Sequence, residues 1–137
     1  MNDIIVNKTQ SLHRCIERAR EEYDLAQGNF RTDYSRQDAA ILNIVRACEL
    51  AIDIANYVIK SHKMGIPTSS AESFQLLARK KVISHTLEQK MENMVGFRNL
   101  TVHQYEKINI AIVEAVIAHG LNDLVAFSEV VMEFLGM

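Results

Sequence analysis

Residues that favour strands and tight turns are scarce in this sequence. The 137 residues include one proline and five glycines, and β-branched residues are not concentrated in short alternating runs. A β-sheet would need such runs, bounded by turn residues, so the composition favours an all-α fold. A chain of this length can bury one hydrophobic core but is short for two, so we expect a single domain over residues 1–137.

The sequence also has few features of a secreted, metal-binding or membrane protein. Its two cysteines, Cys15 and Cys48, lack CxxC spacing and lie among helical apolar positions, so we expect no disulfide, no metal site and no cofactor. The N-terminus has no basic start before a long apolar stretch, and no apolar run approaches the roughly 20 residues of a membrane helix. We therefore expect a cytoplasmic protein with no membrane contact.

A strong excess of positive charge is absent as well. The formal net charge is −2, which argues against a protein that coats nucleic acid through many phosphate contacts. We expect no DNA partner, and any contact with RNA should be local. The basic run Arg79-Lys80-Lys81 could guide RNA, but a favourable interaction with the dipole at an expected helix end is the simpler explanation.

Apolar residues recur at steps of three, four and seven along most of the chain, as they do on one face of a helix. Ser69 and Glu72 have the spacing of a capping box. The pattern predicts helices over Asp3 to about Gln27, from Ser35 as N-cap through Ile59, over about Ser70 to Arg79, from Ser84 into Arg98, and over Ile108 to Leu135 with a bend at Gly120. This order predicts an antiparallel helical bundle of about five to six helices.

The last of these segments contains more apolar residues than one helix face requires. Between Ile108 and Leu135 they occupy several faces, too many for a single stripe against a single neighbour. One small bundle cannot bury so many apolar faces. We therefore expect part of this segment to face another subunit, in a homodimer.

An arginine interrupts the apolar stripe of the fourth expected helix. The steps from Leu87 through Met91 and Met94 lead next to Arg98, where the pattern requires an apolar side chain. A guanidinium on an inward face is either paired with a carboxylate or lines a cleft that receives an anion. In a plain helical scaffold, Glu92 or Glu114 would be the paired acid.

The residues that follow Arg98 form a motif, Arg98-Asn99-Leu100-Thr101-Val102-His103-Gln104-Tyr105. It resembles the R-x4-6-H motif of the HEPN ribonucleases. In the form R-N-x-x-x-H-x-Y, near the end of a long helix, it is similar to the HepT-type toxins of HEPN/MNT toxin–antitoxin pairs, and the resemblance extends to chain length and helix order. Thr101 is polar where the family has an aliphatic residue.

The resemblance implies a HEPN-type bundle and a definite activity. It implies a metal-independent RNA endonuclease, the toxin of a type II or type VII-like toxin–antitoxin system, acting as a homodimer whose paired motifs meet in one cleft. It also implies that a cognate MNT-type (minimal) nucleotidyltransferase antitoxin inhibits the toxin by AMPylation of Tyr105. Without the resemblance, Tyr105 would be expected to pack against the following helix or to stack on a base.

The side chains of the motif suit this chemistry. His103 can take the proton from a ribose 2′-hydroxyl, and Arg98 can stabilise the charge that builds on the attacked phosphate. Asn99 either orients the histidine, touches the phosphate or is an exposed turn residue. On an unbroken helix, five residues separate two side chains by roughly 140°, so the helix should end or distort near residues 100–103.

Other interpretations remain open at this point. HEPN-like bundles can also accompany nucleotidyltransferases as non-catalytic binding modules, in which Arg98 and His103 would be structural. The remaining histidines have no partners at ligand spacing and are interpreted as surface or structural residues: His13, His62, His85 and His119.

Overall fold

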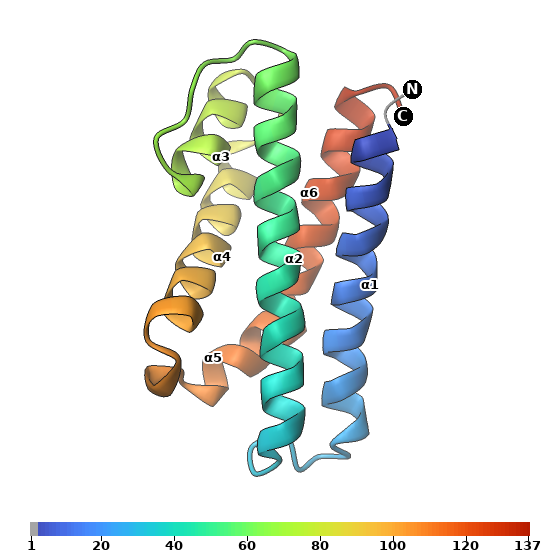
Figure 1. Cartoon of the computed structure of the whole chain (residues 1–137), viewed down its shortest axis with the longest axis vertical. Helices are drawn as coiled ribbons and strands as arrows, with labels where there is room; N and C mark the ends of the chain where they lie inside the picture. Colours follow the sequence, from blue (N-terminus) through green and yellow to red (C-terminus); the bar gives the residue numbers. More distant parts are fainter. Residues whose placement is uncertain (1–2) are drawn as a thin grey trace.

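A computed structural model describes residues 3–137, and helices account for most of them (Figure 1). The helices are α1 (Asp3–Leu25), α2 (Tyr34–Ser61), α3 (Ser70–Arg79), α4 (His85–His103), α5 (Ile110–Ala115) and α6 (Leu121–Phe134). A 3₁₀ turn, Tyr105–Lys107, follows α4, and a π turn, Val116–Gly120, joins α5 to α6. No strand occurs among residues 3–137, so the predicted all-α bundle is confirmed.

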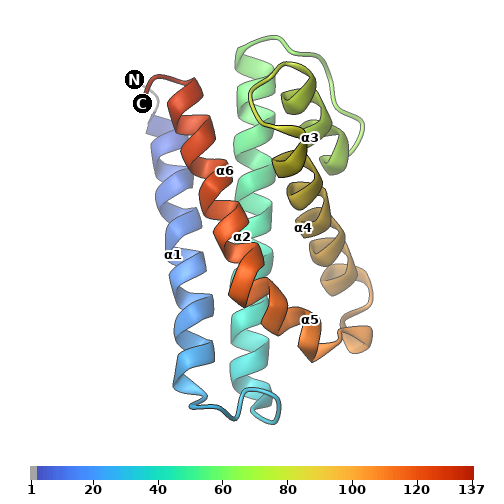
Figure 2. The same cartoon turned by 180° about the vertical axis from the view of Figure 1, so that it is seen from behind.

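The long helices α1 and α2 form an antiparallel hairpin, and the other helices pack around it. Figures 1 and 2 show α6 running alongside α1 and α2, while α3 and α4 lie on the other side of α2. Buried apolar side chains from all these helices form one core, in which Phe74 and Phe127 meet edge to face. Helix α2 therefore contacts both halves of the bundle, and its face toward α4 borders the motif.

Two of the predicted helix starts are confirmed by their caps. The Ser69 hydroxyl accepts a hydrogen bond from the Glu72 amide at 3.1 Å, and the Ser84 hydroxyl accepts one from the Leu87 amide at 3.1 Å. Each cap satisfies an amide of the first turn that has no partner within its helix. The expected limits of α3 and the expected start of α4 are therefore correct.

The predicted cap of α2 is wrong by two residues. Asp33, not Ser35, is the N-cap, and its carboxylate accepts a hydrogen bond from the Arg36 amide at 3.1 Å. Aspartate caps a helix as well as serine does, so the earlier residue takes this place and Ser35 falls in the first turn. The helix is longer by two residues at this end, and its start lies beside the 3₁₀ turn that follows α4.

The expected irregularity near Gly120 is present as a π turn that ends at this residue. A Cβ atom at Gly120 would lie 2.9 Å from Met94 Sδ and 3.2 Å from Val116 Cγ1. The absence of a side chain therefore lets the last helical segment approach α4 closely. The segment begins at Ile110 rather than at Ile108, because the 3₁₀ turn occupies the residues before it.

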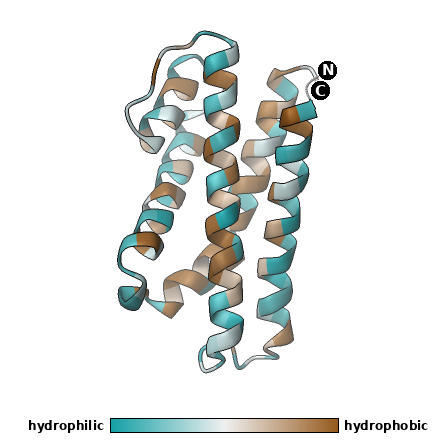
Figure 3. Ribbon diagram, viewed as in Figure 1, coloured by the Kyte–Doolittle hydropathy of each residue, from teal (hydrophilic) through white to brown (hydrophobic). Residues whose placement is uncertain are grey.

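One stretch, Ile110–Phe134, is long and apolar enough to cross a membrane by length and composition, contrary to the expectation from sequence. A third of its most apolar window is buried inside the bundle, against the other helices. A core helix of a soluble protein meets the same criterion, so this is weak evidence for a membrane span. Figure 3 shows the apolar residues along α5 and α6.

Candidate active site

Helix α4 stays regular through the motif. The Gln104 amide still bonds to the Leu100 carbonyl at 2.8 Å, and only at Gln104, with φ −143°, does the chain leave the helix. The expected end near residues 100–103 is present at His103, but no distortion separates the arginine from the histidine. The side chains of Arg98 and His103 in one chain therefore stay roughly 140° apart.

The polar Thr101 fits inside this regular helix. Its side chain is buried, and its hydroxyl donates a hydrogen bond to the Arg98 carbonyl at 2.7 Å. Such a bond back to the preceding turn satisfies a hydroxyl that would otherwise be buried without a partner. A threonine at this position is therefore compatible with a continuous α4.

Arg98 points from α4 toward α2. Its Nη2 donates to Glu49 Oε2 at 3.1 Å, and its Nη1 donates to Asn99 Oδ1 at 3.0 Å. The side chain is 28% exposed, and within residues 3–137 its Nε has no hydrogen-bond partner. The guanidinium is thus held in one place at the edge of the core, while part of it faces solvent.

Neither acid that the scaffold interpretation required pairs with Arg98. Glu92 accepts a hydrogen bond from Gln75 instead, and Glu114 pairs with Arg31. The actual pair with Glu49 is only partly buried, and such pairs contribute about 0–1 kcal/mol. An incoming phosphate can therefore replace Glu49 at low cost, so the ion pair leaves Arg98 available to an anion.

Arg98 lies in a cleft of about 300 Å³ between α2, α3 and α4. Its lining residues are Glu49, Ile52, Asp53, Ser70 and Arg98. Two carboxylates and one guanidinium make this cleft acidic in a single protomer. A phosphate that approaches Arg98 here meets unfavourable charge, and additional positive charge from another surface would favour its binding.

His103 is exposed at the last position of α4. It makes no hydrogen bond or ion pair within the part of the chain that the structure describes. Asn99 is exposed and bonds to Arg98, so it positions the arginine rather than the histidine. The imidazole is therefore free to meet a substrate or a second protein.

Tyr105 is the first residue of the 3₁₀ turn, and its hydroxyl donates a hydrogen bond to the Asp38 carboxylate on α2. The residue is 45% exposed. Partial burial, together with the hydrogen bond to Asp38, raises the pKa of Tyr105 to about 12. The phenol therefore keeps its proton at neutral pH and is oriented by α2.

Asp38 and Glu49 are the residues that reasoning from sequence missed. They are eleven positions apart on α2, which places them within about 20° of each other around the helix and about 16 Å apart along it. Two acids at this spacing, on the polar edge of a core helix, could have predicted a pair of acceptors for polar groups on a neighbouring segment. What the sequence could not show is that this edge faces α4 and the turn after it.

Three of the other histidines have structural contacts. His13 shares a hydrogen bond with Ser128 at 3.1 Å, the His62 ring lies tilted against the Phe134 ring with centroids 5.1 Å apart, and His85 pairs with Glu88 at 3.0 Å. Among residues 3–137, no group of three or more His, Cys, Asp or Glu side chains could hold a metal ion. The basic run at 79–81 ends α3 and lies at the opposite end of α4 from the motif.

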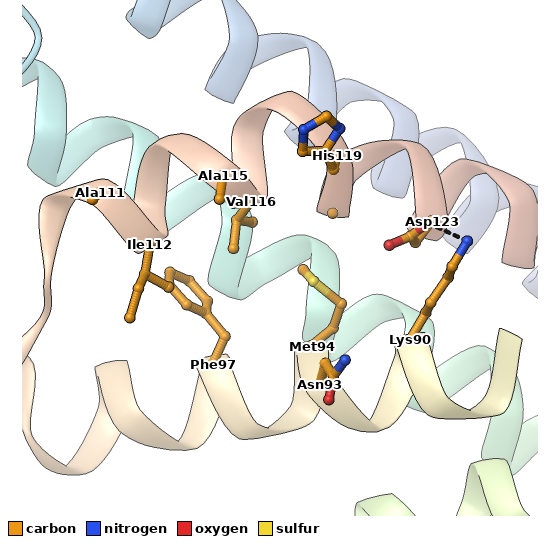
Figure 4. A pocket seen from close by; sticks show the side chains of 11 residues that line it. Lys90, Asn93, Met94, Phe97, Ala111, Ile112, Ala115, Val116, His119 and Asp123 are labelled. Atoms are coloured by element: carbon orange, nitrogen blue, oxygen red, sulfur yellow. Dashed lines mark ion pairs between the residues drawn. The ribbon is translucent and has the colours of Figure 1, made fainter. Parts of the chain in front are cut away.

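An apolar groove of about 420 Å³ separates α4 from the α5–α6 segment (Figure 4). Phe97 on α4 and Ile112 on α5 face each other across it, His119 lies on the α5–α6 side, and Lys90 pairs with Asp123 at one end at 3.7 Å. Ile112 is 46% exposed. The groove and the exposed side of α5 form an apolar surface next to the helix that carries the motif.

Comparison with known proteins assigns this arrangement to a family. The family model described as "Ribonuclease HepT-like" matches residues 12–131, which is most of the chain. The chain belongs to the ribonuclease HepT-like family. The family and the enzyme class expected from the motif are therefore confirmed, and the chain is a ribonuclease by family.

Similar proteins match over almost their whole length. The "mRNA nuclease HepT" of Shewanella oneidensis is 44% identical over 132 residues, covering 96% of this chain and 98% of the relative. A solved structure of the tri-AMPylated HEPN toxin of Shewanella oneidensis in complex with its MNT antitoxin has a TM-score of 0.92 and 42% identity, covering 97% of this chain and 99% of that one. A toxin–antitoxin structure with AMP-PNP has a TM-score of 0.90 and 42% identity, with coverage of 96% and 99%.

Proposed function

We propose that this chain is the toxin of a HEPN/MNT toxin–antitoxin pair, a metal-independent endoribonuclease that uses Arg98 and His103 and acts in the cytoplasm as a single-domain protein. The observation that supports this most is the placement of the motif. Arg98 is held at a cleft by a weak ion pair, and His103 is exposed at the end of the same helix. The similarity to an mRNA nuclease makes mRNA the substrate to test first.

The chemistry requires two groups from the motif. His103 takes the proton from a ribose 2′-hydroxyl, whose oxygen then attacks the adjacent phosphorus. Arg98 leaves Glu49 and donates to the phosphate oxygens, where charge builds during the attack. As the bond from phosphorus to the 5′-oxygen breaks, that oxygen takes up a proton from water, and the protonated His103 returns its proton to water. The product ends in a 2′,3′-cyclic phosphate or in the 3′-phosphate formed from it by hydrolysis.

We infer that a homodimer completes the site. The regular α4 keeps Arg98 and His103 of one chain apart, and the cleft around Arg98 is acidic. A second copy can place its own motif opposite the first, so that the arginine of one protomer and the histidine of the other face one substrate. The apolar surface beside α4 and α5 supplies area for such an association.

We propose that the cognate nucleotidyltransferase transfers AMP from ATP to Tyr105. A relative of this chain is AMPylated in complex with its antitoxin, and Tyr105 is nearly half exposed, two residues after His103. An attached AMP would place a bulky group and a negative phosphodiester beside the position of the RNA phosphate. Substrate would then be blocked by volume and repelled by charge.

Cleavage of a synthetic RNA in excess chelator tests the nuclease proposal. We expect the purified chain to cut the RNA at an unchanged rate and to leave a 2′,3′-cyclic phosphate or a 3′-phosphate, which mass spectrometry of the fragments identifies. A strict requirement for magnesium would contradict the mechanism.

Incubation with the antitoxin, ATP and magnesium tests the regulation. Intact mass should rise by whole AMP units, and peptide mapping should locate them on Tyr105. Tyr105→Phe should keep most of the nuclease activity and escape inhibition. Tyr34→Phe is the matched control, because Tyr34 is 72% exposed and lines the same small cavity as Tyr105. Equal modification and inhibition of Tyr105→Phe and wild type would exclude Tyr105 as the site.

A further inference from the structure

A carboxylate of the toxin itself lies against the proposed AMP acceptor. The Tyr105 hydroxyl donates its hydrogen bond to Asp38 Oδ1, although the two residues are 67 positions apart in the sequence. Asp38 is exposed, and Tyr105 is partly so. The contact therefore lies at the surface, where the active site of a second protein can reach the phenolic oxygen without opening the bundle.

The contact forms part of the wall of a cavity of about 290 Å³ between the first turns of α2 and the 3₁₀ turn. The apolar side chains of Ile41 and Ile108 also line the cavity, and Glu106 is a second carboxylate in its lining. Because Tyr105 keeps its proton at neutral pH, the phenol is a poor nucleophile unless a base takes this proton as the new bond forms. In residues 3–137 the only acceptor bonded to this hydroxyl is Asp38.

We propose that Asp38 is a catalytic residue of the AMP transfer, with its carboxylate receiving the phenolic proton of Tyr105. This inference rests on the proposed function, because it requires that Tyr105 accepts AMP. As the phenolic oxygen bonds to the α-phosphorus of ATP, the bond from that phosphorus to the β-phosphate oxygen breaks and pyrophosphate leaves. The proton passes to Asp38 and then to water. The toxin thus supplies the base for its own inactivation.

The rate of AMP transfer in Asp38→Asn tests the base directly. The amide keeps an oxygen that can accept the phenolic hydrogen bond, so the position of Tyr105 is retained while the basicity is removed. With the antitoxin, magnesium and ATP, we expect kcat for the first AMP addition to fall by about 10²-fold, with little change in KM for ATP. From about pH 7 to about pH 9 the wild-type rate should stay flat, whereas the variant rate should rise as hydroxide replaces the lost base.

Two further variants distinguish loss of the Asp38 carboxylate from a general change of charge in the cavity. Asp38→Glu, which restores a carboxylate, should recover part of the rate. Glu106→Gln removes a charge from the same cavity without touching the Tyr105 hydroxyl, and it should be modified at the wild-type rate. RNA cleavage by all three variants should match wild type, because neither acid contacts Arg98 or His103.

Three outcomes would overturn the proposal. If Asp38→Asn had the wild-type kcat and pH profile, Asp38 would not be the base. If Asp38→Ala were slow while Asp38→Asn was normal, Asp38 would only position the phenol, and its role as proton acceptor would be wrong. If the wild-type chain gained no AMP on Tyr105 from an active antitoxin, the proposed regulation would fail, and the role of Asp38 would fail with it.

Discussion

The two carboxylates on one face of α2 hold different kinds of partner. Glu49 meets the charged guanidinium of Arg98, whereas Asp38 accepts a hydrogen bond from the neutral phenol of Tyr105. His103 lies between these partners in the sequence and has no such contact in the described chain. Helix α2 therefore holds Arg98 and Tyr105 in place. It does not hold His103, the proposed base for RNA cleavage, which is free to contact another surface at the end of α4.

Removing either reactive group of the motif should have the largest effect. Arg98→Ala and His103→Ala should each lower RNA cleavage by about 10²-fold or more, with nearly unchanged helical content by circular dichroism. His85→Ala is a control at the other end of α4, and it should cleave normally because His85 is exposed and, within residues 3–137, pairs only with Glu88. Cleavage by Arg98→Ala or His103→Ala at the wild-type rate would refute the assigned roles.

The apolar surface of the groove and α5 should control the association of two protomers into a dimer. Light scattering should give twice 15.6 kDa for the wild-type chain. Ile112→Asp places a charge in the groove beside α4 and should weaken the dimer by about tenfold or more, and cleavage should fall in parallel. Ile66→Asp is the matched control, because Ile66 is 91% exposed in the loop before α3. An active monomer at micromolar concentration would contradict the shared site.

Replacing Glu49 tests whether its carboxylate competes with the RNA phosphate for Arg98. Glu49→Gln removes a negative charge from the phosphate cleft but keeps an acceptor for Arg98, so KM for RNA should fall a few fold. Glu49→Ala also removes the acceptor that holds the guanidinium at the cleft before RNA binds, so KM should fall less than in Glu49→Gln, and kcat should be unchanged in both variants. Both variants should lose less than about 1 kcal/mol of stability in urea unfolding. A rise in KM for Glu49→Gln would show that Glu49 does not compete with phosphate.

The smallest expected effect is the contribution of Tyr105 to the free energy of unfolding at alkaline pH. Its pKa is raised from the ordinary 10.0 to about 12, so the folded state holds the phenolic proton more tightly than the unfolded state does. This contribution is fully present below about pH 10 and is lost as the pH rises toward about 12. Urea unfolding should show the stability of wild type falling more steeply over this range than that of Tyr105→Phe. Equal slopes would mean that folding does not raise the pKa of Tyr105, so that neither burial nor the hydrogen bond to Asp38 holds the phenolic proton in solution.

The sequence predicted the parts of the structure that depend on local signals. Helical periodicity and the side-chain caps Ser69 and Ser84 act within a few residues, so the limits of α3 and the start of α4 could be read directly. The residues to which we assign functions, Arg98, His103 and Tyr105, came from one contiguous motif. These features require no knowledge of how the helices pack.

The partners of these residues depend on packing and could not be predicted in the same way. Glu49 lies 49 positions from Arg98, and Asp38 lies 67 positions from Tyr105, so neither pair has a local signal. The expected distortion within the motif was inferred from the need to bring arginine and histidine together in one chain. The helix stays regular through His103, and the Gln104 amide still bonds to the Leu100 carbonyl. We therefore propose that the arginine and the histidine meet between two protomers rather than within one.

The central claim is that Arg98 of one protomer and His103 of the other form one site, and mixing two inactive variants tests it most directly. Arg98→Ala and His103→Ala protomers are unfolded together, refolded as a mixture, and assayed for RNA cleavage. Random pairing makes about half of the dimers mixed, and each mixed dimer contains one intact arginine–histidine pair of two, so about a quarter of the wild-type activity should return. If the mixture stayed as inactive as either variant alone while mass spectrometry showed mixed dimers, each protomer would carry its own complete site, and the account of a shared cleft would be wrong.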